Sequence, residues 1–168
     1  MGTGKTSVGR ELARRKKRQF VDLDELIEMR QKRRIADIFA KEGEPYFRKI
    51  EKLALREVAK ENNFVVACGG GIVIDPDNIK IMKATGAVIC LTACPKVIFE
   101  RTRGYEHRPL LNVPEPEKQI ELLLKLRAPY YARADKEIDT SKTPLSGVVD
   151  KILGFVEKKG RKKKNVRD

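Results

Sequence analysis

The sequence has no long hydrophobic run. No apolar stretch in it approaches the roughly 20 residues that a helix needs to cross a bilayer. Its amino terminus also shows no apolar signal segment behind a basic start. These absences argue against a membrane protein, and we expect a cytoplasmic chain without a membrane partner.

Cysteine and histidine are also scarce. The three cysteines, Cys68, Cys90 and Cys94, form no CxxC pair and no cluster with histidine, so nothing suggests a cysteine-ligated metal. Their odd number favours free thiols in a cytoplasmic protein, and we expect those thiols to be largely buried. The only histidine, His107, lies in a polar stretch, and we assign it no catalytic role.

Charge, in contrast, is abundant and mostly of one sign. The 168 residues include 37 Lys and Arg against 24 Asp and Glu, a formal net charge of +13, with 40% hydrophobic residues. This length and composition are typical of one globular domain, which we place at residues 1–157. Residues 158–168 hold seven basic side chains and no aromatic ones to stack on bases. We therefore predict a disordered basic tail, no nucleic-acid partner and, because no long exposed apolar stripe is evident, a monomer.

Short apolar runs alternate with longer segments of helical period, which predicts an α/β fold with three layers around a mainly parallel sheet. The runs at 64–68 and 87–91 are apolar throughout, as expected for strands buried on both faces. In the helix predicted over 45–61, Arg48 and Glu51 lie one turn apart and can pair. We predict strands at 20–22, 64–68, 87–91 and 137–139, and helices at 4–17, 24–29, 45–61, 95–103, 117–133 and 144–158.

The first six residues match the phosphate-loop pattern G-x-x-x-x-G-K-[ST] from its third position onward. In such a loop, glycines let backbone N–H groups curl around phosphates, and the following helix favours their negative charge. Lys5 would bridge the outer phosphates and the Thr6 hydroxyl would bind Mg²⁺, so we predict ATP and Mg²⁺ as cofactors. The alternative is a glycine-rich turn beside a helix. The predicted nucleotide contacts in this loop are Gly2, Thr3, Gly4, Lys5, Thr6 and Ser7.

In folds that carry this loop, a buried central strand leads into it, but here nothing precedes Met1. Without that strand, a parallel sheet would leave backbone donors and acceptors unpaired on the strands at either side. We expect that Met1 is an internal methionine and that the natural product begins earlier, with the first central strand ahead of it.

Two carboxylates follow the first predicted strand. Asp22 and Asp24 stand two residues apart at its carboxyl end, where α/β folds place ligands, so both side chains face one side. Phosphoryl transfer is mainly positioning and charge neutralisation, and it calls for cations, a metal and an acid near the acceptor hydroxyl. The alternative is that one or both aspartates cap a helix.

The motifs and their order resemble the shikimate kinase family along nearly the whole chain. The segments that carry the resemblance are GTGKTSVGRELA, FVDLDELIE, IADIFAKEGEPYFRKIE, the triple glycine at 69–71, RPLL at 108–111 and LRAPYYARAD. The resemblance implies a kinase that transfers the γ-phosphoryl group of ATP to the 3-hydroxyl of shikimate, in chorismate and aromatic amino acid biosynthesis. It also implies a helical substrate-binding region at about 24–61 and a lid at about 104–116.

The resemblance further implies a role for particular residues. Asp22 helps to hold hydrated Mg²⁺ together with Thr6, while Asp24 orients or deprotonates the attacking hydroxyl. Glu51 steers the side chain of Arg48, and Leu110 and Leu111 anchor the closed lid. The implied catalytic groups are Lys5, Asp24 and Arg108, the last being the lid arginine that closes onto the ATP phosphates. The implied substrate contacts are Asp24, Arg48, Gly69, Gly70, Gly71 and Arg127, and Arg101 and Lys142 flank the adenine.

Other functions stay open at this point. A related kinase could act on gluconate or a nucleoside monophosphate, although a phosphate-bearing acceptor would call for more arginines than Arg48 and Arg127. The chain could also be a remnant without catalytic activity. The triple glycine and the RPLL segment favour shikimate over the other small acceptors.

Overall fold

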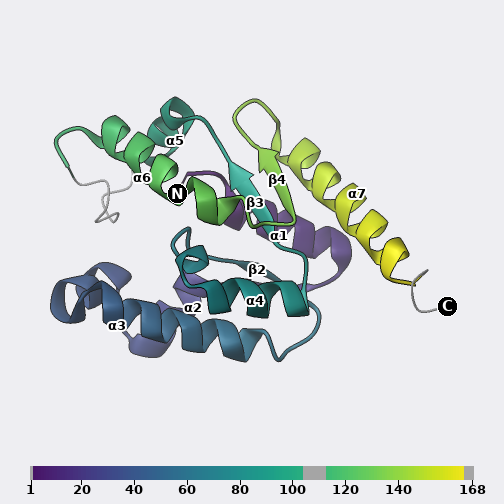
Figure 1. Ribbon diagram of the computed structural model, residues 1–168, viewed down its shortest axis with the longest axis horizontal. Coiled ribbons are helices and arrows are strands. Elements are labelled where there is room, and N and C mark those ends of the chain that lie inside the picture. Colours follow the sequence, from purple (N-terminus) through teal and green to yellow (C-terminus); the bar gives the residue numbers. More distant parts are fainter. Residues whose placement is uncertain (1, 104–112, 165–168) are drawn as a thin grey trace.

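The computed structural model describes residues 2–103 and 113–164, with the backbone alone for 161–164 (Figure 1). All four predicted strands and all six predicted helices are present, with boundaries that differ in detail. The strands are β1 (Gln19–Asp22), β2 (Phe64–Ala67), β3 (Ile89–Thr92) and β4 (Lys136–Asp139). The helices are α1 (Lys5–Lys16), α2 (Leu23–Gln31), α3 (Ile35–Val58), the 3-10 turn η1 (Ile72–Ile74), α4 (Pro76–Thr85), α5 (Pro95–Thr102), α6 (Pro116–Tyr131) and α7 (Leu145–Lys164).

The strands form two parallel pairs in the described part of the chain. β1 pairs with β2, with Asp22 opposite Ala67, and β3 pairs with β4, with Thr92 opposite Asp139. Helices α2, α3 and α4 lie near the first pair, whereas α5, α6 and α7 lie near the second (Figure 1). The α/β class and the parallel strands are as the sequence predicts.

A cavity of about 690 Å³ separates the two pairs and is lined by both β2 and β3. The prediction that these two strands are buried on both faces is therefore wrong: Val65, Val66, Ile89 and Cys90 are only partly buried. The physical reason is that each strand has one edge beside the cavity and not beside another strand.

Helix α1 connects the two halves of the molecule. It contacts β1, β2 and α7, and a Cβ on its Gly9 would lie 2.5 Å from the Phe20 ring, so helix and strand are tightly packed. On the other side, Val8 joins a buried cluster with Ile138 and Val149. This packing holds the first turn of α1 beside the carboxyl end of β1.

The helix predicted over 45–61 begins ten residues earlier, at Ile35, and ends at Val58. It consists of two helical segments, because Gly43 has φ 78° and ψ 174°, which no helix contains. The missed first segment is buried through Ile38, which packs with Leu23 and Phe47 in the largest apolar cluster. A short segment before a glycine and a proline offers too few turns for a clear helical period.

The carboxyl-terminal helix is longer than predicted. Helix α7 continues to Lys164, so the prediction of a disordered tail is wrong for residues 158–164, and residues 165–168 lie outside the described part. Val156 still packs on the core, and Lys159 Nζ lies 2.7 Å from Asp135 Oδ2. These contacts and the helix-forming lysines extend the helix. Among the described helices, none combines the length and the apolar character that a membrane span requires.

Candidate active site

The phosphate loop leads directly into α1. Gly4 is the residue before the helix and adopts φ 81°, the left-handed region that favours glycine. No side chain caps the first turn of α1 and no acidic residue lies in it. The backbone N–H groups there and the positive end of the helix dipole make this turn suited to an anion such as a phosphate.

Two oxygens beside this turn are suited to a metal ion. Thr6 Oγ1 donates a hydrogen bond to Asp22 Oδ2 at 2.8 Å, while Asp22 Oδ1 accepts from the Asp24 backbone N–H at 3.1 Å. Asp22 is therefore both a helix cap and the neighbour of the phosphate loop. Mg²⁺ prefers oxygen ligands and takes only one or two from the protein. Residues 2–103 and 113–164 contain no cluster of three or more His, Cys, Asp or Glu side chains that would form a fuller metal site.

Arg101 fixes the backbone of the phosphate loop. Its guanidinium donates to the Gly2 carbonyl at 3.3 Å and to the Thr140 carbonyl at 2.9 Å. Thr140, only 4% exposed, lies with its hydroxyl 3.2 Å from the carbonyl oxygen of Thr3. Sequence reasoning missed Thr140, which carries no motif and acts through its position after β4. Lys142 is exposed on the same turn.

The glycine turn (residues 69–71) follows β2 and is the point where three helices meet. A Cβ on Gly71 would overlap the guanidinium of Arg48, from α3. A Cβ on Gly69 would lie 3.1 Å from the carboxylate oxygen of Asp24, from α2. A Cβ on Gly70 would lie 3.7 Å from the guanidinium of Arg127, from α6. The side chains predicted to bind the substrate therefore converge on the glycine turn.

The predicted pair of Arg48 and Glu51 is confirmed. Arg48 Nη1 donates to Glu51 Oε2 at 2.7 Å, and Nη2 donates to Glu44 Oε1 at 2.8 Å. Glu51 is fully buried, and its other oxygen has no hydrogen-bond partner among the described residues. Burial raises the pKa of Glu51 to about 7, against the charge of Arg48, and the charge of Asp24 adds to the increase. Two glutamates thus fix the direction of one guanidinium.

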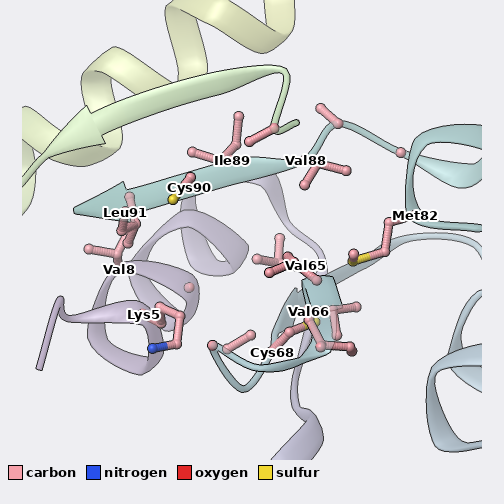
Figure 2. Close-up of a pocket in the computed structure, with 18 of the residues that line it drawn as sticks. Lys5, Val8, Val65, Val66, Cys68, Met82, Val88, Ile89, Cys90 and Leu91 are labelled. Carbon is pink, nitrogen blue, oxygen red and sulfur yellow. The ribbon is translucent and has the colours of Figure 1, made fainter. Parts of the chain in front are cut away.

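Asp24 lies in the first turn of α2, facing both the glycine turn and the phosphate loop. Burial raises its pKa above the usual range, and the negative charge of Asp22 adds to this, whereas Lys5 opposes it. A carboxylate whose pKa is raised in this way accepts a proton more readily than an exposed one. Lys5, Arg127 and Gly70 line the cavity between the strand pairs, and Figure 2 shows Lys5 among the labelled residues of this cavity.

Tyr131 contacts the glycine turn, and the sequence analysis did not identify it. Its hydroxyl donates to the Gly70 carbonyl at 3.1 Å, and burial raises its pKa. It stands one helical turn after Arg127 on α6, inside a segment already noted for its resemblance. Spacing alone could have suggested that both side chains point the same way. The predicted lid residues Arg108, Leu110 and Leu111, and His107, lie outside the described residues.

The phosphate-binding turn, the hydroxyl and carboxylate beside it, and the cluster at the glycine turn all lie at the carboxyl ends of parallel strands. Together with the α/β fold, they define a kinase of the phosphate-loop class that acts on small molecules. Comparison with known proteins narrows this class, since the sequence model of the shikimate kinase family matches residues 1–157. The chain belongs to the shikimate kinase family.

Relatives cover nearly the whole chain. A shikimate kinase from Caldanaerobacter subterraneus is 41% identical over 162 residues, 96% of this chain and 95% of the relative. One from Thermodesulfovibrio yellowstonii is 42% identical, over 94% of this chain and 91% of the relative. Among solved structures, shikimate kinase from Acinetobacter baumannii in complex with shikimate has a TM-score of 0.90 at 37% identity, covering 95% and 89% of the two chains. The Aquifex aeolicus enzyme has a TM-score of 0.82 at 32% identity, covering 95% and 94%.

Proposed function

We propose that this chain is a shikimate kinase that transfers the γ-phosphoryl group of ATP to the 3-hydroxyl of shikimate, a step in aromatic amino acid biosynthesis. The observation that carries the proposal is the convergence of Asp24, Arg48 and Arg127 on the glycine turn, next to Lys5. The Acinetobacter relative, similar over nearly the whole chain, is a complex with shikimate.

The acceptor end of the site is built for a carboxylate. Arg48 and Arg127 approach the glycine turn from different helices, and guanidinium groups bind carboxylates through two parallel hydrogen bonds. Glu51 and Glu44 already occupy part of the Arg48 guanidinium, and the guanidinium lies against Gly71 of the glycine turn. The glycines at 69–71 let the substrate ring lie close to the main chain.

Asp24 acts on the attacking hydroxyl. Its carboxylate lies at the glycine turn and is close enough to Lys5 for that charge to affect its pKa. It accepts a hydrogen bond from the 3-hydroxyl, orients it toward the γ-phosphorus and takes its proton as the new bond forms. Its raised pKa favours this proton transfer over that of an exposed aspartate.

The residues at the phosphate-binding end of the site neutralise the negative charge of the ATP phosphates. Gly2, Thr3, Gly4 and Ser7 surround the phosphates with backbone N–H groups at the start of α1, and Lys5 binds the outer phosphates. Thr6 and Asp22, already 2.8 Å apart, would hold Mg²⁺, which when bound neutralises the phosphate oxygens. Arg108 in the lid completes the charge clamp and excludes water as the lid closes. Arg101 and Lys142 lie on the side of the loop where we place the adenine.

The same proposal describes a cytoplasmic monomer that recognises neither membranes nor nucleic acid. What supports it is that two of the basic side chains near the carboxyl end of α1 are paired within the protein. Glu11 contacts both Arg14 and Arg15, and Arg15 also pairs with Asp150 at 2.6 Å.

The test of the function is ADP release from ATP and Mg²⁺ with shikimate, gluconate or AMP as acceptor. We expect release above background with shikimate only. The two arginines at the glycine turn suit a carboxylate, which AMP lacks, and the glycines admit a ring, which gluconate lacks. An Arg127→Lys variant should raise the KM for shikimate more than it lowers kcat, since the lysine keeps the charge but loses the paired hydrogen bonds. Equal turnover with gluconate would assign the chain to another acceptor.

A further inference from the structure

Thr140 is a buried polar residue at which three parts of the chain meet. It directly follows β4 and is only 4% exposed. Its hydroxyl oxygen lies 3.2 Å from the Thr3 carbonyl oxygen, 3.0 Å from the Thr92 carbonyl oxygen and 3.0 Å from Arg101 Nη1. The phosphate loop, the carboxyl end of β3 and helix α5 therefore all contact one hydroxyl group.

The proton of this hydroxyl is directed to the Thr3 carbonyl. A threonine hydroxyl has one proton to donate and two lone pairs that accept, whereas an arginine guanidinium only donates, so Arg101 donates to the hydroxyl. The Thr92 carbonyl already accepts the backbone N–H of Thr140 at 2.8 Å. Among the described residues, the hydroxyl is the only donor to the Thr3 carbonyl. The proton therefore satisfies a carbonyl that otherwise has no partner in the described part of the chain.

This hydrogen bond fixes the direction of a peptide group in the phosphate loop. A trans peptide is planar, and its C=O and N–H point in opposite directions. When Thr140 holds the Thr3 carbonyl, the Gly4 N–H of the same peptide points away from Thr140. Arg101 acts in the same way on the preceding peptide, because it donates to the Gly2 carbonyl at 3.3 Å and so turns the Thr3 N–H away. Within residues 2–103 and 113–164, neither of these two N–H groups has an acceptor.

We propose that Thr140 is a positioning residue for ATP, whose hydroxyl holds the peptide between Thr3 and Gly4 with its N–H toward the phosphates. This inference rests on the proposed function, because it takes the phosphate loop to bind ATP. Successive N–H groups on one side of a turn form a concave anion site, and the positive φ of Gly2 (60°) and Gly4 (81°) allows such a turn. Without the hydroxyl, the Thr3 carbonyl loses its donor and the peptide turns more readily.

The test is a Thr140→Val variant, which keeps the shape of the side chain and removes the hydroxyl. We expect the KM for ATP to rise about fivefold to thirtyfold, while the KM for shikimate changes less than about twofold. Thr102→Val is the matched control: Thr102 is also 4% exposed and lies beside Gly2, but its hydroxyl bonds only carbonyls of its own helix, with Ile98 at 2.7 Å. Thr140→Ser keeps the hydroxyl and should keep the parent KM for ATP. An unchanged KM in Thr140→Val, or an equal rise in both valine variants, would overturn the proposal.

NMR of the ligand-free protein gives a second readout, the ¹³C chemical shift of the Thr3 carbonyl. This carbon should move upfield in Thr140→Val, where its oxygen loses a hydrogen bond, and should not move in Thr102→Val. An unmoved Thr3 carbonyl in Thr140→Val would also overturn the proposal. Thr140→Ala serves the same comparison where valine at position 140 prevents folding. Because this readout uses neither ATP nor shikimate, its result is separate from the outcome of the kinase assay.

Discussion

Glu51 is the residue on which the acceptor site depends most. It is fully buried, it bonds Arg48 at 2.7 Å, and its second oxygen has no partner among the described residues. A buried carboxylate with a free lone pair is held charged only by the arginine beside it. Glu51 therefore positions Arg48 at the expense of stability.

Glu51 makes stability depend on pH. Its pKa rises from 4.5 to about 7 on folding, so between these values the folded state binds more protons than the unfolded state and stability falls as pH rises. Below about pH 4.5 the carboxyl is protonated in both states and the loss is absent. We expect the loss to develop between about pH 4.5 and pH 7 and to reach about 3 kcal/mol at most. Urea unfolding at pH 5 to 8 measures it.

A Glu51→Gln variant tests both roles of Glu51, the effect on pH-dependent stability and the positioning of Arg48. It should lack this part of the pH dependence while raising the KM for shikimate about tenfold, because Arg48 loses its charged partner. Glu44→Gln is the matched control, since Glu44 contacts the same guanidinium but is exposed. If both variants had the same pH profile as the parent protein, Glu51 would not be the titrating group.

Tyr131 fixes the glycine turn. Tyr131→Phe removes the hydrogen bond to the Gly70 carbonyl and keeps the ring, so we expect the KM for shikimate to rise about threefold to tenfold with a smaller change in kcat. The neighbouring Tyr130→Phe serves as the control, because the Tyr130 ring stacks with Arg133 and has no role in the turn. Steady-state kinetics with varied shikimate distinguish the two; equal effects would contradict a positioning role for Tyr131.

At the scale of elements, the break in α3 decides where Arg48 points. Gly43 adopts a backbone conformation with positive φ, which separates the segment that buries Ile38 from the one that carries Arg48. Gly43→Ala should lower the free energy of unfolding by about 1–3 kcal/mol, since an alanine is strained there.

Gly154→Ala is the matched control for the break. Gly154 lies inside α7 with open space around it, so an alanine there should stabilise the protein by about 0.5–1 kcal/mol. Thermal unfolding compares the two directly. A loss of stability at both positions would mean that Gly43 has no special conformational role.

At this scale, features that depend on a local sequence pattern can be predicted from the sequence, whereas features that depend on contacts with distant elements cannot. Lys5, Thr6 and Asp22 follow from local patterns, a loop at a helix start and an acid at a strand end, and the structure brings them together. The first segment of α3 and the length of α7 depend on burial of Ile38 and Val156 against distant elements. Thr140 belongs to no pattern, and Tyr131 lies in a recognised segment that does not by itself reveal its partner, because the contacts of both join residues far apart in the chain.

At the scale of the whole molecule, the site spans both strand pairs. The acceptor cluster lies beside β1 and β2, whereas Thr140 and Arg101, which hold the phosphate loop, belong to the half with β3 and β4. Helix α1 contacts both halves. Helix α1 therefore joins the half whose residues hold the phosphate loop to the half that carries the acceptor cluster.

The most direct measurement of the central claim is ³¹P NMR of a reaction containing the protein, ATP, Mg²⁺ and shikimate. A phosphomonoester signal should grow together with that of ADP, should disappear when shikimate is omitted, and should fall by at least about a hundredfold in an Asp24→Asn variant that keeps the fold. Loss of ATP to inorganic phosphate alone, or an undiminished phosphomonoester signal in the Asp24→Asn variant, would contradict it.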